Sequence, residues 1–209
     1  MSIKLIIFDI GNTILKQEKS DKFEKMQKIL NCDIAMLKNN FYKIFNKNNK
    51  NLKDSTYKLL QSLNINDGKL QTRLLEYLPS LQNRKGKFEF INDNILEIFE
   101  YIKKQNIKLI LCSNSNVLSK NNDEQLKPYV DDIERTYKIG FLKNENSFYE
   151  YFENKYKVSS NEILSIGDDI ENDFEIPKSH GWNSILFTEN MTGSELLSKI
   201  KFIIDKMKS

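Results

Sequence analysis

Three short segments place chemically active side chains directly after apolar runs of the kind that form buried strands. They are residues 8–13 (FDIGNT), residues 111–114 (LCSN) and residues 166–169 (IGDD), with Asp173 close behind. In an open parallel α/β sheet the carboxyl ends of the strands line one crevice, where such folds bind ligands. A lone carboxylate, a hydroxyl and a carboxylate cluster at that edge suit metal-assisted chemistry on an anion.

Asp9 and Ser113 each admit two interpretations. Asp9 precedes Gly11 and Asn12, a pair typical of a tight turn, where a carboxylate can act as a nucleophile or metal ligand or can simply cap the turn. Ser113 and Asn114 end the second apolar run. A hydroxyl and neighbouring backbone amides at a helix start can hold a phosphate oxygen, although an ordinary serine N-cap fits the same pattern.

The third segment is the most acidic part of the chain. Asp168, Asp169, Glu171 and Asp173 fall within six positions. Clustered carboxylates repel one another unless a cation or basic group offsets them, and oxygen ligands favour Mg²⁺ over zinc. Helix capping explains Asp168 or Asp169 but not all three aspartates. This segment therefore predicts a metal site.

Lys143 is the remaining candidate site residue, and His180 limits the kinds of site that the chain can form. Lys143 precedes a stripe of helical spacing, where its charge could offset carboxylate and phosphate charge; a solvated surface lysine is the other interpretation. His180 is the only histidine, so Ser-His-Asp catalysis and histidine-based zinc sites lack the residues that they require.

Apolar runs at residues 3–8, 107–112, 163–166 and 184–187 predict strands that are buried on both faces. Stripes of helical spacing lie between and after them, over residues 95–102, 148–156 and 196–204. This alternation predicts an α/β fold with a doubly wound parallel sheet, similar to the Rossmann fold.

About 100 residues separate the first two predicted strands, far more than the dozen or so that one crossover needs. Residues 17–82 carry four stripes of helical spacing, separated by Asn-rich breaks. We expect an all-α insertion of about four helices over residues 16–86, which ends in a return linker at residues 83–86. Residues 1–15 and 87–209 would then form the core domain.

Charge and composition limit the classes of function that fit this chain. The net charge of +3 is too small to indicate nucleic-acid binding, but residues 16–90 hold 16 Lys and Arg against 8 Asp and Glu. That basic segment could attract phosphorylated substrates, or its lysines could merely solvate helix surfaces. No apolar stretch approaches the roughly 18 residues of a membrane span, and the first strand leaves no room for a signal peptide. Two cysteines favour a reducing cytoplasm over a disulfide framework.

The ordered set of motifs resembles the haloacid dehalogenase-like hydrolase superfamily from Ile3 to about Phe187. Asp9 matches the nucleophile of its D-x-D-G-T motif, Ser113 the hydroxyl residue of its second motif, and Lys143 the lysine of its third. Gly167-Asp168 followed by Asp173 matches its acidic fourth motif. The helical insertion is similar to the family's C1 cap.

This resemblance implies a Mg²⁺-dependent phosphatase that acts on a small phosphorylated metabolite. Asp9 would attack phosphorus and form an aspartyl-phosphate, which water would then hydrolyse. Mg²⁺ would be held by Asp9, Asp168 and the backbone carbonyl of Gly11, supported by Asp173 or Asp169. Ser113, Asn114 and Lys143 would bind the phosphoryl oxygens, with Lys143 also restraining Asp9.

Three departures from the family pattern affect this expectation. Gly11 stands where typical family phosphatases carry a second Asp, the general acid and base, although some members resemble this chain in carrying Gly-Asn there. Asn12 replaces a glycine, and Asn144 replaces a frequent proline. Gly11 argues against a phosphomutase, and Asp168 and Asp173 argue against dehalogenation, which needs no metal. Phosphonatase chemistry would require a distinguished lysine in the insertion, and none stands out.

Two alternatives stay open at this point. The chain could be a catalytically weak relative that binds a phosphorylated ligand or a protein partner, which Gly11 favours. It could also process nucleic acid through its basic insertion, which predicts strongly salt-dependent binding to oligonucleotides. The sequence leaves the oligomeric state undetermined.

Overall fold

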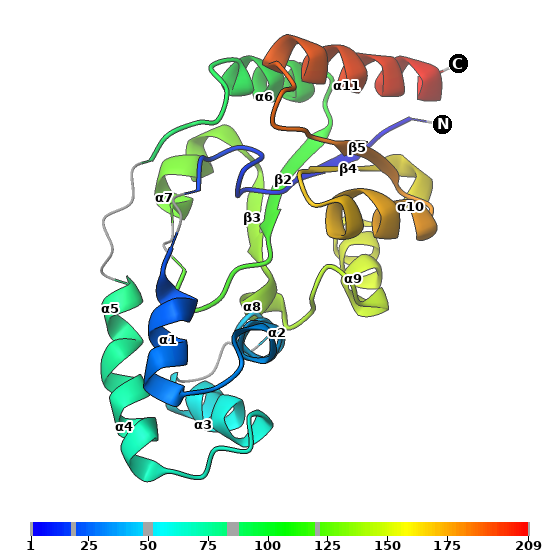
Figure 1. Ribbon diagram of the computed structural model, residues 1–209. Helices are drawn as coiled ribbons and strands as arrows, with labels where there is room; N and C mark the ends of the chain where they lie inside the picture. The colour runs from blue at the N-terminus through cyan, green and yellow to red at the C-terminus, as the bar shows by residue number, and fades with distance from the viewer. Residues whose placement is uncertain (1, 18–19, 48–51, 83–87, 120–121, 209) are drawn as a thin grey trace.

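Strand β1 (Leu5–Phe8) forms the centre of a five-stranded parallel sheet in the order β3-β2-β1-β4-β5 (Figure 1). Its partners are β2 (Lys108–Ser113) and β4 (Ile163–Gly167), and the sheet ends at β3 (Asp132–Arg135) and β5 (Asn183–Leu186). The computed structural model describes residues 2–17, 20–47, 52–82, 88–119 and 122–208. The predicted doubly wound parallel sheet is confirmed.

Side chains of β1 alternate between two apolar layers, one on each face of the sheet. Ile6 and Phe8 pack with helices α6 (Ile95–Lys104) and α11 (Gly193–Lys208). Leu5 and Ile7 pack on the opposite face with α9 (Asn146–Tyr156), whose aromatic residues Phe148, Tyr149 and Phe152 fill that layer. Because helices cover both faces of the sheet, the central strands appear in the sequence as continuous apolar runs. The central strands β1, β2 and β4 were predictable for this reason, and β5 was also predicted although it lies at the edge of the sheet.

Strand β3 was not predicted. Its sequence, Asp-Ile-Glu-Arg, carries three charged residues in four, so it lacks the apolar run of a central strand. An edge strand pairs on one side only, and charged side chains are common there. It nevertheless pairs with β2 and adds a strand to the sheet, with Arg135 opposite Ser113 at the carboxyl end of β2.

The long segment between β1 and β2 forms a separate helical unit, which we define as helices α1 to α5. Four of its helices are long, as predicted, and the fifth is a single turn. They are α1 (Lys22–Leu30), α2 (Ile34–Phe45), α3 (Leu52–Ser62), α4 (Gly68–Tyr77) and α5 (Pro79–Gln82). The unit has its own apolar core, and it lies apart from α6 and α11 in Figure 1. The division at residues 15 and 87 stays a prediction, because the return linker at residues 83–86 lies outside the described residues.

Short helices complete the part of the protein that contains the sheet. They are α7 (Asp123–Leu126), η1 (Lys127–Tyr129), α8 (Thr136–Ile139), η2 (Ser160–Glu162), the π-helix η3 (Ile170–Glu175) and α10 (Ile176–Ser179). Cys32 and Cys112 are both free thiols. Across the described part of the chain, we find no helix with the length and apolar character that crossing a membrane requires.

Candidate active site

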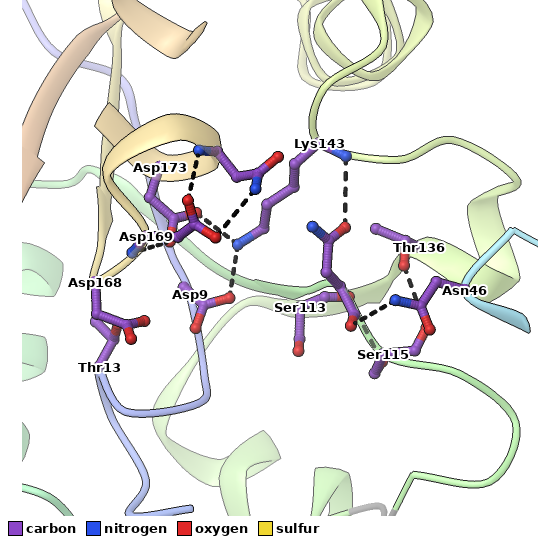
Figure 2. A network of polar contacts seen from close by, with 12 residues as sticks. Asp9, Thr13, Asn46, Ser113, Ser115, Thr136, Lys143, Asp168, Asp169 and Asp173 are labelled. Carbon is purple, nitrogen blue, oxygen red and sulfur yellow. Dashed lines mark hydrogen bonds and ion pairs between the residues drawn. The ribbon is translucent and has the colours of Figure 1, made fainter. Parts of the chain in front are cut away.

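Three strand ends meet at the carboxyl edge of the sheet, because β1 lies between β2 and β4. Asp9 directly follows β1, Ser113 ends β2, and Asp168 directly follows β4. The backbone N–H of Asp9 donates to the carbonyl of Ile166 at 2.8 Å, so the β1–β4 pairing extends to the first residue of the site. The candidate residues of all three segments therefore lie at one edge (Figure 2).

Lys143, in the loop between α8 and α9, reaches into this edge. Its Nζ donates to Asp9 Oδ1 at 2.6 Å and to Asp173 Oδ1 at 2.7 Å, and the residue is only 4% exposed. Its backbone is also held, since its N–H donates to Asn114 Oδ1 at 3.4 Å and its carbonyl accepts from the Tyr149 hydroxyl at 2.8 Å. Lys143 is therefore not a solvated surface lysine.

Burial and charge perturb the titration of this cluster. Burial, together with the Asp173 carboxylate, raises the pKa of Asp9 to about 7 against the attraction of Lys143. Burial alone would lower the pKa of Lys143, but the Asp173 and Asp9 carboxylates outweigh it and raise that pKa above its usual value. Lys143 therefore stays charged at neutral pH, and Asp9 titrates near neutrality unless more positive charge is supplied.

Asp168 is oriented by a buried threonine. The Thr13 hydroxyl, which is 0% exposed, donates to Asp168 Oδ1 at 3.1 Å. Burial raises the pKa of Asp168, and the hydrogen bond from Thr13 acts in the opposite direction. Figure 2 shows the two side chains facing each other beside Asp9.

Asp169 and Asp173 have different tasks. The Asp169 carboxylate caps η3, because its Oδ1 accepts from the backbone N–H groups of Glu171 and Asn172 at 3.0 Å each. Burial alone would raise the pKa of Asp169, but the hydrogen bonds from Asn172 and Glu171 hold it below its usual value. The Asp173 carboxylate instead binds Lys143 through Oδ1 and accepts from the backbone N–H of Asp169 through Oδ2 at 3.2 Å.

The carboxylates form a donor set that suits a hard cation. One oxygen atom from each of Asp9, Asp168 and Asp173 lies within 4.8 Å of the others. Oxygen donors of this kind are those that Mg²⁺ prefers, and Mg²⁺ usually completes its octahedron with water and substrate oxygens. The residues present therefore fit magnesium.

Gly11 lies in a tight turn after β1. The N–H of Asn12, whose φ is 54°, donates to the carbonyl of Leu15 at 2.8 Å. The side chain of Gln17 covers Gly11 so closely that a Cβ on residue 11 would lie 1.7 Å from Gln17 Nε2. A side chain at this position would therefore require Gln17 to move.

Ser113 and Asn114 lie at the end of β2, but the expected helix start after them is wrong. The next helix, α7, begins at Asp123. A local turn takes its place: Asn116 Oδ1 accepts from the N–H of Leu118 at 3.0 Å, and Ser119 Oγ accepts from the N–H of Asn116 at 3.0 Å. Side-chain bonds of this type compete with helix formation.

A family model for haloacid dehalogenase-like hydrolases matches residues 3–181. The chain belongs to the haloacid dehalogenase-like hydrolase family. The resemblance seen in the motifs is thereby confirmed at the level of the family. No curated protein sequence matches this hydrolase.

Solved structures of the same fold align with nearly the whole length of this HAD-like hydrolase. One is a haloacid dehalogenase-like family hydrolase from Xanthomonas campestris, 17% identical, with a TM-score of 0.64 over 98% of this chain and 93% of that one. Another is a predicted HAD-like family hydrolase from Porphyromonas gingivalis, 14% identical, with a TM-score of 0.62 over 96% and 98%. A third is an aspartate-to-alanine mutant of a HAD family enzyme from Bacteroides thetaiotaomicron, solved with magnesium and inorganic phosphate, 12% identical, with a TM-score of 0.62 over 93% of this chain and 98% of that one.

Gly167 of this hydrolase allows Asp173 to reach Lys143. A Cβ on residue 167 would lie 2.1 Å from Asp173 Oδ2 and 2.3 Å from its Cγ. We expect Gly167→Ala to displace the Asp173 carboxylate and to lower the free energy of unfolding by about 1–3 kcal/mol. Urea denaturation measures this change.

Gly68→Ala is the matched control for this prediction, because nothing lies within 4 Å of a Cβ at residue 68, the first residue of α4. We expect this variant to be as stable as the parent or more stable, since alanine restricts the unfolded chain and favours helix. Equal stability of the two variants would contradict the close approach at Gly167.

The sequence did not identify two residues that organise the site. Thr13 stands inside the first motif, but its spacing from Asp9 does not reveal that it would orient Asp168. Asn46 lies beyond the end of α2 and contacts the backbone of Asn114, 68 residues away. A contact of that range leaves no local pattern in the sequence.

Proposed function

We propose that this HAD-like hydrolase is a Mg²⁺-dependent phosphomonoester hydrolase that acts on a small phosphorylated metabolite. The observation that carries the proposal is the buried ammonium of Lys143, which binds Asp9 at 2.6 Å and Asp173 at 2.7 Å beside Asp168. A lysine and three carboxylates at the carboxyl edge of a parallel sheet provide a nucleophile, a cation site and a positive charge for an anionic substrate.

The metal would be held by Asp9, Asp168 and the backbone carbonyl of Gly11. Asp173, which already binds Lys143, would support the site through that bond, and its position favours it over Asp169 for this role. When bound, Mg²⁺ would offset the negative charge of the carboxylates and the phosphoryl group.

In the proposed reaction, an Asp9 carboxylate oxygen attacks phosphorus and forms a bond to it. The bond from phosphorus to the ester oxygen breaks, and the leaving group departs as an alkoxide or aryloxide, which takes its proton from water. Water then hydrolyses the aspartyl-phosphate, which releases phosphate and regenerates Asp9. Lys143 aligns Asp9 and, with Ser113 and Asn114, binds the phosphoryl oxygens. The helical unit would cover the site as a C1-type cap.

Two solved relatives support the choice of substrate class. The Bacteroides thetaiotaomicron enzyme was solved as a complex with magnesium and inorganic phosphate. A protein from Thermococcus onnurineus, 17% identical, with a TM-score of 0.52 over 95% of this chain and 98% of that one, is described as a HAD phosphatase. Phosphate-ester hydrolysis is therefore the first activity to test.

The experiment measures Mg²⁺-dependent phosphate release from p-nitrophenyl phosphate and from a panel of sugar and nucleotide monophosphates. An aryl leaving group departs with little need of a proton, so it tests Asp9 and the metal separately from Gly11. Turnover of aryl and alkyl esters would indicate a substitute acid. Turnover of aryl esters alone would show a working nucleophile without a general acid. Phosphate release from neither class of ester would contradict the proposal.

Asp168→Asn is expected to weaken magnesium binding by about tenfold or more, because a neutral amide replaces a charged ligand beside Asp9. Isothermal titration with Mg²⁺ measures this directly, without a substrate. Glu171→Gln is the matched control, since it removes a charge from the same acidic segment at an exposed position. Equal magnesium affinity in the two variants would exclude Asp168 as a ligand.

A second candidate is a catalytically weak relative that binds a phosphorylated ligand or a protein partner. Gly11 favours it, because no side chain at that position can donate a proton to the leaving group. General acid and base assistance typically contributes a factor of about 10² to 10⁴ in rate. Phosphate binding without release of phosphate from any ester would favour this candidate.

A further inference from the structure

A buried asparagine joins the helical unit to the candidate phosphate-binding segment of the core. Asn46 directly follows α2 and is 4% exposed. Its Nδ2 donates to the backbone carbonyl of Asn114 at 3.1 Å, and its Oδ1 accepts from Asn116 Nδ2 at 3.0 Å. Figure 2 shows Asn46 beside Ser115, close to the strand end that carries Ser113.

The loop after Ser113 is anchored to both parts of the protein. On the core side, the carbonyl of Ser115 accepts from the Thr136 hydroxyl at 3.2 Å. On the other side, Val117 and Leu118 pack into the apolar core of the helical unit. The loop therefore has little freedom to move unless the helical unit moves with it.

Asn114 is the point where these contacts reach the catalytic centre. Asn46 holds its backbone carbonyl, and the N–H of Lys143 donates to its Oδ1 at 3.4 Å. A chain of hydrogen bonds thus runs from Asn46 through Asn114 and Lys143 to Asp9. The peptide group between Asn114 and Ser115 is therefore held by the Asn46 side chain, which belongs to the helical unit.

We propose that Asn46 is a positioning residue through which the helical unit sets the Ser113–Asn114 segment for binding a phosphoryl group. This inference rests on the proposed function, because it assigns that segment to the phosphoryl oxygens. If docking of the helical unit orders this segment and so strengthens anion binding by some factor, anion binding must strengthen that docking by the same factor.

The neighbouring residue offers a matched control. Lys47 forms an ion pair with Glu145 at 2.6 Å, so it also joins the end of α2 to the core. The two side chains are 46% and 31% exposed, and exposed pairs contribute little. Lys47→Ala therefore removes a contact between the same two units without leaving a buried polar group unpaired.

The test compares KM for a phosphate ester and the inhibition constant of inorganic phosphate in the parent, Asn46→Ala and Lys47→Ala. We expect Asn46→Ala to raise both constants about tenfold, because the Asn114 carbonyl loses its buried partner, while kcat changes less. Lys47→Ala should leave both within about twofold of the parent. Asn46→Asp keeps an acceptor for Asn116 but loses the donor to Asn114, so it should resemble Asn46→Ala.

A purely structural role for Asn46 would lower stability but leave KM of the folded enzyme unchanged. Equal KM values for Asn46→Ala and Lys47→Ala would overturn the inference. If the parent hydrolyses no ester, the proposed function fails instead, and amide hydrogen exchange of residues 113–118 then decides on positioning. Faster exchange in Asn46→Ala than in Lys47→Ala supports it, and equal exchange overturns it.

Discussion

Asp9→Asn is expected to abolish turnover and, at the same time, to make the metal-free protein more stable. The amide cannot attack phosphorus, so we expect a loss of at least about 10³-fold in kcat. Its oxygen can still accept a hydrogen bond from Lys143 Nζ, which lies 2.6 Å from Asp9 Oδ1. The substitution removes one negative charge from a cluster of three carboxylates and one ammonium, in which Asp173 and Lys143 are buried.

The gain in stability should depend on pH in a defined direction. The pKa of Asp9 is about 7 in the folded protein and near its ordinary value of 3.8 when unfolded. As the pH rises between these values, the unfolded state loses its proton first, so the parent protein loses stability. The asparagine side chain of the variant does not titrate. The advantage of Asp9→Asn should therefore be near zero at pH 4 and reach about 4 kcal/mol above pH 7, because each pH unit between the two pKa values contributes about 1.4 kcal/mol.

Thermal unfolding in EDTA at several pH values, together with phosphate release, measures both effects. Asp205→Asn on the exposed face of α11 makes the same chemical change far from the site and should alter neither quantity. An inactive Asp9→Asn that is also less stable at pH 8 would indicate a folding role for Asp9. An active Asp9→Asn would contradict the proposed mechanism.

The position of the site was predictable because it depends on the sheet. Apolar runs identified β1, β2 and β4, and the carboxyl ends of parallel strands meet at one edge. Asp9 and Asp168 directly follow β1 and β4, and Ser113 ends β2, so their placement needed no knowledge of loops. Strand β3 was not predicted, because its charged residues lack the apolar run by which the other strands were recognised.

What the sequence did not reveal are the contacts that orient these side chains. Lys143 was identified by its match to a family motif, but the aromatic residue that fixes its carbonyl, Tyr149, lies on the following helix and looks like an ordinary core residue. Thr13 and Asn46 act across 155 and 68 residues respectively. Such contacts depend on how loops and helices dock, which a single sequence does not encode in any local pattern.

Lys143→Met is expected to destabilise the protein more than any other single change at the site. Lysine and methionine are similar in length, so the variant keeps much of the packing but removes the charge. Asp9 and Asp173 then lie close together in a buried site without a compensating cation. Breaking a buried ion pair by removing one partner typically costs about 3–5 kcal/mol. Turnover should also be lost, because Asp9 is no longer aligned and the phosphoryl group loses a positive contact.

A second variant separates charge from packing. Lys143→Met combined with Asp173→Asn removes one of the two carboxylates that Lys143 binds, so it should recover part of the lost stability in urea denaturation. It should recover no turnover, because Asp9 still lacks its restraint. A double variant no more stable than Lys143→Met would show that the loss comes from packing. Recovery of stability without activity is the result expected if Lys143 holds two carboxylates together for the chemistry of one of them.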